Sequence, residues 1–156
     1  LGYHLINQLP KRAYFGVDIL PSAIKVAEQK ILDNPVLLSK NPQVLISSSS
    51  ADIKTIAAHN KLNTFIFNSV FTHMSLDLIE DYLVALISLD NDNIKILGDI
   101  STPKSKISTN KRNVDYLHTI KDFETVAEKA GWKIYKTIKE QANEVYQPML
   151  LILTKK

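Results

Sequence analysis

The sequence contains no cysteine among its 156 residues. A chain without cysteine has no disulfide framework, no thiolate zinc site and no cysteine nucleophile, and it is compatible with a reducing compartment. Long apolar runs are also missing, because no segment approaches the ~20 residues that a membrane-spanning helix needs. The N-terminus lacks the basic and then apolar layout of a secretory signal. Together these absences predict a soluble, cytoplasmic protein without a membrane partner.

A strong excess of one charge is missing as well. The formal net charge is +3 and the isoelectric point is about 9.0, and most lysines are interleaved with acids, which argues against a nucleic-acid partner. The most basic segment, Lys104 to Arg112, is interpreted as a solvated loop. His4, His59 and His118 lack the spacing with acidic residues that metal ligands show, so no metal site is expected.

What the sequence does contain is the composition of an ordinary globular protein, 45% hydrophobic and 22% charged. Its length corresponds to about one domain, and we predict a single domain over residues 1–156. Segments with apolar residues at helical spacing alternate with short apolar runs that are typical of strands. Helices are expected over residues 3–9, from Pro21 to a stop at Asn34-Pro35, and over 51–62, 75–89 and 119–131, and strands over 13–20, 42–49, 63–71, 93–100, 132–140 and 146–156.

Local signals fix several of these elements. Ser75 is expected to cap one helix and Gly131 to end another. The strand 63–71 lacks polar alternation, as expected where both faces of a sheet are covered, and the polar segment 101–113 is expected to be a loop. The residues expected to face the core are Ile24, Ala27, Ile31 and Leu32 in one helix, Ile53, Ile56 and Ala57 in the next, Leu78, Ile79, Tyr82, Leu83 and Leu86 in the third, and Ile120, Phe123, Val126 and Ala127 in the last.

The repeated alternation of strand and helix implies a mostly parallel sheet with helices on both faces. The last two strands have no helix between them, so they should pair antiparallel through a turn near Gln141 to Asn143. The predicted fold class is therefore α/β, with three layers and a C-terminal antiparallel hairpin.

Four stretches occur in a characteristic order: "YFGVDIL", an apolar strand that ends near an acid; "FIFNSVFTHMS", an apolar strand that runs into a turn and a histidine; "ILGDI"; and "VAEKAGWKIYK". With the terminal hairpin, this layout resembles the Rossmann-like class I methyltransferases that use S-adenosylmethionine, and the resemblance covers nearly the whole chain. The four stretches resemble the second strand, the fourth strand, the fifth strand, and the late helix with the sixth strand of that family.

The front of the chain departs from the family pattern. The family begins with a first strand and a glycine-rich turn, whereas this sequence retains only "LGY", with Gly2 placed 16 positions before Asp18. In the family the first strand lies between the second and the fourth, and buried strand edges without partners are costly. We therefore expect the second and fourth strands not to pair directly, and we expect residues before Leu1, or another segment or chain, to fill the gap.

The resemblance implies a cofactor site for S-adenosylmethionine. Asp18 would accept hydrogen bonds from the vicinal ribose hydroxyls, or alternatively cap the helix that begins near Pro21. Ile19 and Leu20 would flank the adenine or ribose, or alternatively belong to the core. Gly2 would be the last glycine of the cofactor turn.

The next two strands add further candidates. Ser50 and Ala51 stand where the family often has an acid and its neighbour near the adenine amino group, with Asp52 just beyond; a serine hydroxyl can also accept that hydrogen bond, and its alternative role is a helix cap. The residues that would lie at the carboxyl end of the fourth strand and frame the cofactor are Asn68, Ser69 and Val70.

His73 is the candidate catalytic residue. An imidazole with a pKa near ~6.5 can take a proton from an attacking oxygen or nitrogen, although a histidine at a helix start can also serve only local packing. Asp99 is a further candidate on the acceptor side. The segment Thr102 to Asn113 would either cover the substrate or form a surface loop.

These inferences predict a methyltransferase that acts on a small molecule. A methyltransferase-like interaction module without activity is the alternative, because most of the glycine-rich motif is absent. A nicotinamide-dependent oxidoreductase would share the role of Asp18, but the terminal hairpin argues against it.

Overall fold

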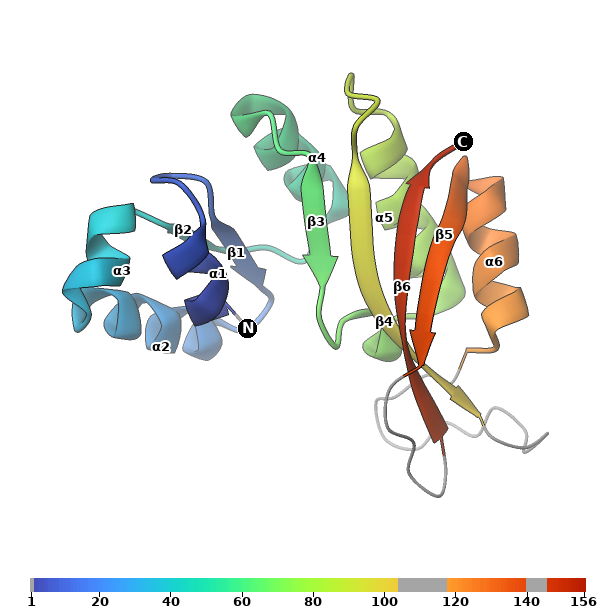
Figure 1. Cartoon of the computed structure of the whole chain (residues 1–156), viewed down its shortest axis with the longest axis horizontal. Coiled ribbons are helices and arrows are strands. Elements are labelled where there is room, and N and C mark those ends of the chain that lie inside the picture. The colour runs from blue at the N-terminus through green and yellow to red at the C-terminus, as the bar shows by residue number, and fades with distance from the viewer. Residues whose placement is uncertain (1, 104–117, 140–145) are drawn as a thin grey trace. The chain divides into compact units, whose positions relative to one another are not determined.

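The computed structural model describes residues 2–103, 118–139 and 146–156, and apart from the additional helices α3 and η1 its elements follow the order expected from the sequence (Figure 1). Contacts divide the chain into two units, Leu1–Asp52 and Ile53–Lys156, which are described separately. The elements are α1 (Gly2–Gln8), β1 (Phe15–Asp18), α2 (Pro21–Leu32), α3 (Pro35–Lys40), β2 (Gln43–Ile46), α4 (Ser50–Asn60), β3 (Thr64–Phe67), η1 (Phe71–His73), α5 (Leu76–Ile87), β4 (Lys95–Pro103), α6 (Ile120–Lys129), β5 (Trp132–Lys139) and β6 (Tyr146–Lys155). Within the described ranges, every helix is too short or too polar to cross a lipid bilayer.

The first unit has a small core around one pair of strands. β1 and β2 run parallel, with Asp18 opposite Ile46. Ile6, Ile24 and Leu37, from α1, α2 and α3, are each at most 7% exposed. Leu32 was predicted to face the core but is 61% exposed, because Ile24 and not the C-terminal end of α2 supplies the buried contact.

The stop predicted at Asn34-Pro35 is also the start of a further helix, α3, which the sequence pattern does not predict. The Asn34 side chain accepts hydrogen bonds from the backbone N–H groups of Val36 at 3.0 Å and Leu37 at 3.2 Å. Pro35 occupies the first helical position, where a missing N–H costs nothing. The pair therefore ends α2 and begins α3.

Replacing Asn34 with alanine is expected to destabilise α3 by about 1 kcal/mol, since two N–H groups lose their acceptor. The measurement is hydrogen exchange of the α3 amides, which should become about fivefold faster. Asn34→Asp keeps the acceptor and is the matched control. Equal exchange rates in the alanine variant and the wild type would contradict this assignment.

The second unit is built on a four-stranded sheet in the order β3-β4-β6-β5. β3 and β4 are parallel, and β6 runs antiparallel to both β4 and β5, which confirms the predicted hairpin pairing; its turn at 141–143 lies outside the described residues. α5 and α6 cover one face of this sheet (Figure 1). Trp132 is fully buried and donates a hydrogen bond from Nε1 to the backbone oxygen of Leu83 at 2.9 Å.

The helix predictions in this unit are largely confirmed. Ser75 caps α5 by accepting from the N–H of Leu78, and Gly131 follows α6 with a φ of +86°. Leu78 itself was predicted to face the core but is 40% exposed. The face that packs is defined by the spacing of the buried residues Ile79, Tyr82, Leu83 and Leu86, and Leu78 lies beside it.

β3 is shorter than predicted, and its burial alternates. Phe65 and Phe67 are each 8% exposed, whereas Ile66 is 42% exposed. The prediction of a strand covered on both faces is therefore wrong within this unit, because only one face packs against the core. β4 extends through residues 101–103, which had been expected to be loop, and the rest of that expected loop lies outside the described residues.

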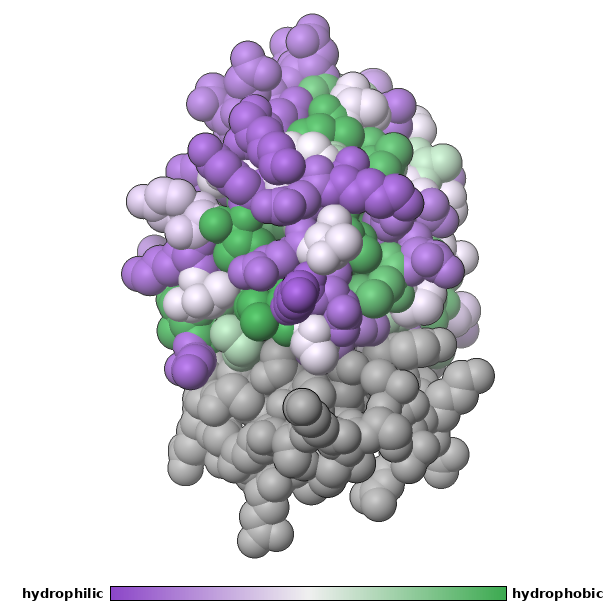
Figure 2. Space-filling model, turned by 90° about the vertical axis from the view of Figure 1, so that its right-hand side faces the viewer, coloured by the Kyte–Doolittle hydropathy of each residue, from purple (hydrophilic) through white to green (hydrophobic). Residues whose placement is uncertain are grey.

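The two edges of the four-stranded sheet differ in charge. On β5, Lys133, Lys136 and Lys139 are exposed, and lysines of this kind discourage pairing with another strand. Hydrophilic side chains predominate on the side where α6 lies (Figure 2). β3 has no charged residue. Among the described residues β3 pairs only with β4, and β1 pairs only with β2.

Candidate functional site

Asp18 is the last residue of β1, and its carboxylate is exposed. Oδ1 accepts a hydrogen bond from the N–H of Leu20 at 2.8 Å. Leu20 occupies the N-cap position of α2, and this helix has no side-chain cap. Asp18 therefore orders the turn between strand and helix. The alternative interpretation, in which Asp18 caps α2, is wrong.

The two residues after Asp18 are apolar and point to solvent. Ile19 is 64% exposed and Leu20 is 55% exposed. The alternative that they belong to the core is therefore wrong. The end of β1 combines an acidic group with apolar surface, and it lies at the carboxyl end of a parallel strand, where open α/β sheets bind their ligands.

The segment after β2 lies next to Asp18, because the N–H of Ser47 donates to the backbone oxygen of Asp18 at 3.1 Å. Ser49, and not Ser50, caps α4: its Oγ accepts from the N–H groups of Ala51 and Asp52. Ser50 is the first residue of the helix. The capping role proposed for Ser50 thus belongs to its neighbour.

Asp52 was not chosen as a candidate residue from the sequence, but its carboxylate lies close to the end of β2. Its Oδ2 accepts a hydrogen bond from the Ser47 hydroxyl at 3.0 Å, which holds the carboxylate at the end of β2. The sequence signal was present, since Asp52 directly follows Ser50 and Ala51. The local hydrogen bonds show that the helix begins one residue earlier than a cap at Ser50 would require.

Gly2 begins α1 and lies close to Tyr14, the residue before β1. A Cβ at Gly2 would lie 2.6 Å from the Tyr14 hydroxyl oxygen, so a larger residue would collide with it. Burial raises the pKa of the Tyr14 hydroxyl above its ordinary value. The absence of a side chain at Gly2 therefore makes room for a half-buried tyrosine, and contact with a cofactor at this position stays a prediction.

In the second unit, the candidates after β3 lie on a tight turn. Asn68 and Ser69 are exposed, and Val70 packs partly against the core. Ser69 has a φ of +55°, in the left-handed region that residues with a side chain seldom adopt. Its N–H donates to Oδ1 of Asp99 at 2.5 Å, across from the neighbouring strand β4.

The rest of this segment is anchored in the core. The Phe71 ring is fully buried and stacks on Phe67, with 4.6 Å between ring centroids. Gly98 on β4 leaves the space that the Phe71 ring fills. Nε2 of the buried His118 donates to the backbone oxygen of Met74 at 2.8 Å, so His118 has a structural role.

His73 ends the 3-10 helix η1, and its side chain is exposed. Its backbone N–H donates to the oxygen of Val70 at 3.0 Å. In the part of the chain that the structure describes, no three acidic or histidine side chains gather as metal ligands would. The chemistry that this unit offers is hydrogen bonding from a fixed loop and proton transfer at one imidazole.

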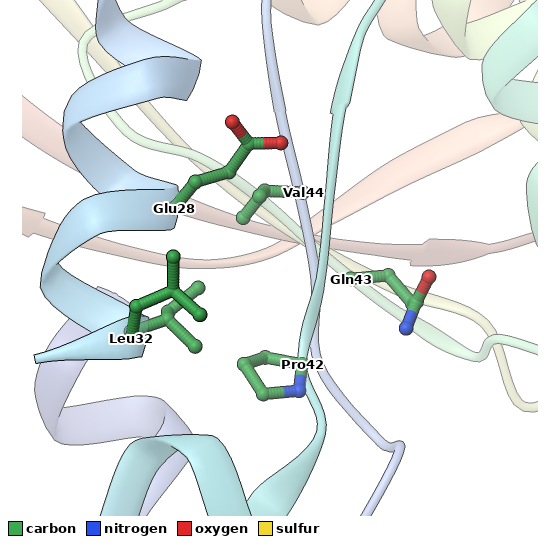
Figure 3. Close-up of a pocket in the computed structure, with 6 residues that line it drawn as sticks. Glu28, Leu32, Pro42, Gln43 and Val44 are labelled. Atoms are coloured by element: carbon green, nitrogen blue, oxygen red, sulfur yellow. The ribbon is translucent and has the colours of Figure 1, made fainter. Parts of the chain in front are cut away.

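A shallow hollow lies elsewhere, between α2 and β2 (Figure 3). Glu28 and Leu32 extend from α2 toward the strand, and Pro42, Gln43 and Val44 form the other side. Gln43 is the first residue of β2, so the hollow lies at the opposite end of the strand from Ser47. It is not part of the candidate site.

The candidates thus form two groups, one in each unit. Asp18, Ile19 and Leu20 lie beside the start of α4 with Ser50 and Ala51, and Gly2 lies near Tyr14. Asn68, Ser69, Val70 and His73 lie on one turn with Asp99. Both groups follow the carboxyl ends of parallel strands.

The order of elements, the parallel pairs and the antiparallel C-terminal strands define the fold of the class I S-adenosylmethionine-dependent methyltransferases. Among solved structures, a methyltransferase from Methanosarcina mazei aligns with a TM-score of 0.69 and 11% identity, over 99% of this chain and 86% of that one. Magnesium protoporphyrin IX methyltransferase from Synechocystis PCC 6803, with S-adenosylhomocysteine bound, aligns with a TM-score of 0.64 and 16% identity.

That second alignment covers 91% of this chain but 64% of the other, so the chain spans less than two thirds of the magnesium protoporphyrin IX methyltransferase. A structure described as a pericyclic reaction enzyme aligns with a TM-score of 0.53 and 10% identity, over 94% of this chain and 44% of that one. Neither a protein-family model nor a curated protein sequence matches this chain. The comparisons therefore establish the fold.

Proposed function

We propose that this protein binds S-adenosylmethionine and transfers its methyl group to a small-molecule acceptor. The observation that carries the proposal is the end of β1: an exposed carboxylate, Asp18, followed by the exposed apolar residues Ile19 and Leu20, in a methyltransferase fold. A carboxylate in this setting can accept hydrogen bonds from two ribose hydroxyls. The apolar side chains suit the face of a nucleoside.

The remaining candidate residues would supply further cofactor contacts. Ser50, Ala51 and the carboxylate of Asp52 would face the adenine, and the turn at residues 68–70 would frame the methionine part. Gly2 would lie near the cofactor at the start of α1. The fixed position of the Asp52 carboxylate supports its inclusion, because an anionic oxygen accepts a hydrogen bond from an amino group more strongly than a serine hydroxyl does.

The bound cofactor would supply an electrophilic methyl group. The chain's own task is then to align the acceptor and to exclude water. His73 would orient the acceptor and take its proton, since an exposed imidazole can act as a general base.

A second function, a methyltransferase-like module that binds a partner without catalysis, is supported by the open strand edges. β1 and β3 each have one paired neighbour among the described residues, and an unpaired edge can accept a strand. The same observation supports the expectation that a further segment or chain pairs with them. The neighbour described as a pericyclic reaction enzyme adds a reason to test for methyl transfer, since the fold alone does not fix the reaction.

The two functions are separated by a thermal-shift measurement with S-adenosylhomocysteine. A ligand that binds only the folded chain adds about 2.7 kcal/mol of stability at a hundred times its dissociation constant, and the unfolding temperature should rise by several degrees. Adenosine monophosphate, which has the ribose hydroxyls but lacks the amino-acid part, is the control and should shift it less. An unchanged unfolding temperature with S-adenosylhomocysteine would favour the interaction module.

A further inference from the structure

The turn after β3 holds a serine in an unfavourable backbone conformation. Ser69 has a φ of +55°, where a Cβ crowds the neighbouring carbonyl oxygen and where glycine is usually found. Something outside the turn must stabilise this conformation.

Asp99 supplies that stabilisation. Its Oδ1 accepts the N–H of Ser69 at 2.5 Å, and its Oδ2 lies 3.5 Å from the Ser69 hydroxyl oxygen. A hydrogen bond from a backbone N–H to a charged carboxylate is stronger than one between neutral groups. Asp99 follows Gly98, which lies opposite Phe67 in the register of β3 and β4, so the carboxylate ties the turn to the sheet.

The neighbouring contacts fix the remainder of the segment. The buried Phe71 ring packs over Gly98, and Met74 is held through its backbone oxygen by His118. Asn68, Ser69 and His73 remain exposed between these anchors. Asp99 is therefore an anchor that directly contacts one of the residues that the proposed function assigns to the cofactor.

We propose that Asp99 is a positioning residue: its carboxylate holds Ser69 in the left-handed conformation and so fixes the backbone of residues 68–70 for cofactor binding. This inference rests on the proposed function, and it differs from the role on the acceptor side that the sequence suggests for Asp99. Asn at this position keeps an oxygen acceptor without the charge, whereas alanine removes the acceptor.

The first test does not depend on any ligand. Hydrogen exchange of the Ser69 amide should be at least about tenfold faster in Asp99→Ala than in the wild type, because the amide loses a hydrogen bond to a charged group. Asp99→Asn should lie between them. Asp81→Ala, which removes an exposed acid from α5, is the matched control and should leave the rate unchanged. A wild-type exchange rate in Asp99→Ala would overturn the inference.

The second test measures the dissociation constant of S-adenosylhomocysteine by calorimetry. Asp99→Ala should weaken binding about tenfold, and Asp99→Asn should recover most of the affinity. The double variant Asp99→Ala with Ser69→Gly should also recover affinity, because glycine adopts the left-handed conformation without a partner. If Asp99→Ala weakened binding only through a general loss of stability, a change in backbone preference at residue 69 would not restore the affinity.

The outcomes separate this inference from the function on which it rests. A wild-type protein that does not bind S-adenosylhomocysteine overturns the proposed function, and with it the role of Asp99 in binding that cofactor. A wild type that binds, together with an Asp99→Ala variant that binds equally well, overturns only the role of Asp99. Weaker binding in Asp99→Ala that neither rescue variant restores has the same consequence.

Discussion

Replacing Asp18 with alanine is expected to weaken the binding of S-adenosylhomocysteine about a hundredfold. Two hydrogen bonds from ribose hydroxyls to a carboxylate would be lost, and hydrogen bonds to charged groups contribute about 1.5–3 kcal/mol each. Tenfold in affinity corresponds to about 1.4 kcal/mol. The measurement is isothermal titration calorimetry of the variant and the wild type.

Asp18 also accepts the N–H of Leu20, so the alanine variant removes two roles at once. Asp18→Asn separates them, because its amide oxygen still serves Leu20 while its NH₂ group cannot accept from a hydroxyl. We expect this variant to bind nearly as weakly as the alanine variant. Asp33→Ala, at the opposite end of α2, is the control and should bind normally. Unchanged affinity in both Asp18 variants would show that the ribose lies elsewhere.

Replacing Gly98 with alanine is expected to lower the free energy of unfolding by about 1–3 kcal/mol, the usual cost of overpacking a core. A Cβ at this position would lie 2.6 Å from Cδ2 of Phe71 and closer still to Cε2. The ring has little freedom to move away, because it is fully buried and its centroid lies 5.5 Å from that of Phe123. Urea unfolding followed by the fluorescence of Trp132, the single tryptophan, reports on this unit.

The specific cause is tested by a smaller partner. In a Phe71→Leu background, Gly98→Ala should cost less than it does in the wild type, since the ring that it strikes is gone. Equal costs in the two backgrounds would mean that the cost does not come from this contact. The same variant should also disturb the turn at Ser69, because Phe71 anchors it.

Element order was largely predictable from the sequence, because local patterns decide it. α5 has its buried residues at helical spacing behind a serine cap, and the terminal strands have no helix between them. The start of α3 was not predicted, since an asparagine followed by proline can end one helix and cap another. Leu32 and Leu78 are apolar residues on helices whose packed face is decided by distant segments, and a single helix pattern cannot choose between neighbouring faces.

The sequence predicts that the candidate residues lie near the ends of strands, but it does not predict the hydrogen bonds that hold them in place. The place of Asp18 at the end of a strand could be predicted, because an acid after an apolar strand is a local signal. The hydrogen bond from Ser69 to Asp99 joins residues 30 positions apart, and the one between His118 and Met74 joins residues 44 apart. Pairings of this kind depend on strand register, which no local pattern contains. The left-handed conformation of Ser69 could not be predicted either, because it depends on the same long-range contact and serine is not a residue type that indicates this conformation.

The difference between the edges of the four-stranded sheet limits how copies of this unit can join through it. Lysines line the β5 edge, whereas β3 is uncharged and has one paired neighbour among the described residues. Growth of a continuous sheet through many copies needs two receptive edges on every copy. In the described part of this sheet only the β3 edge lacks charged side chains that oppose strand pairing. Pairing of two copies through their β3 strands would leave only the lysine-bearing β5 strands as edges. The lysines on β5 therefore disfavour the growth of a continuous sheet through many copies of this unit.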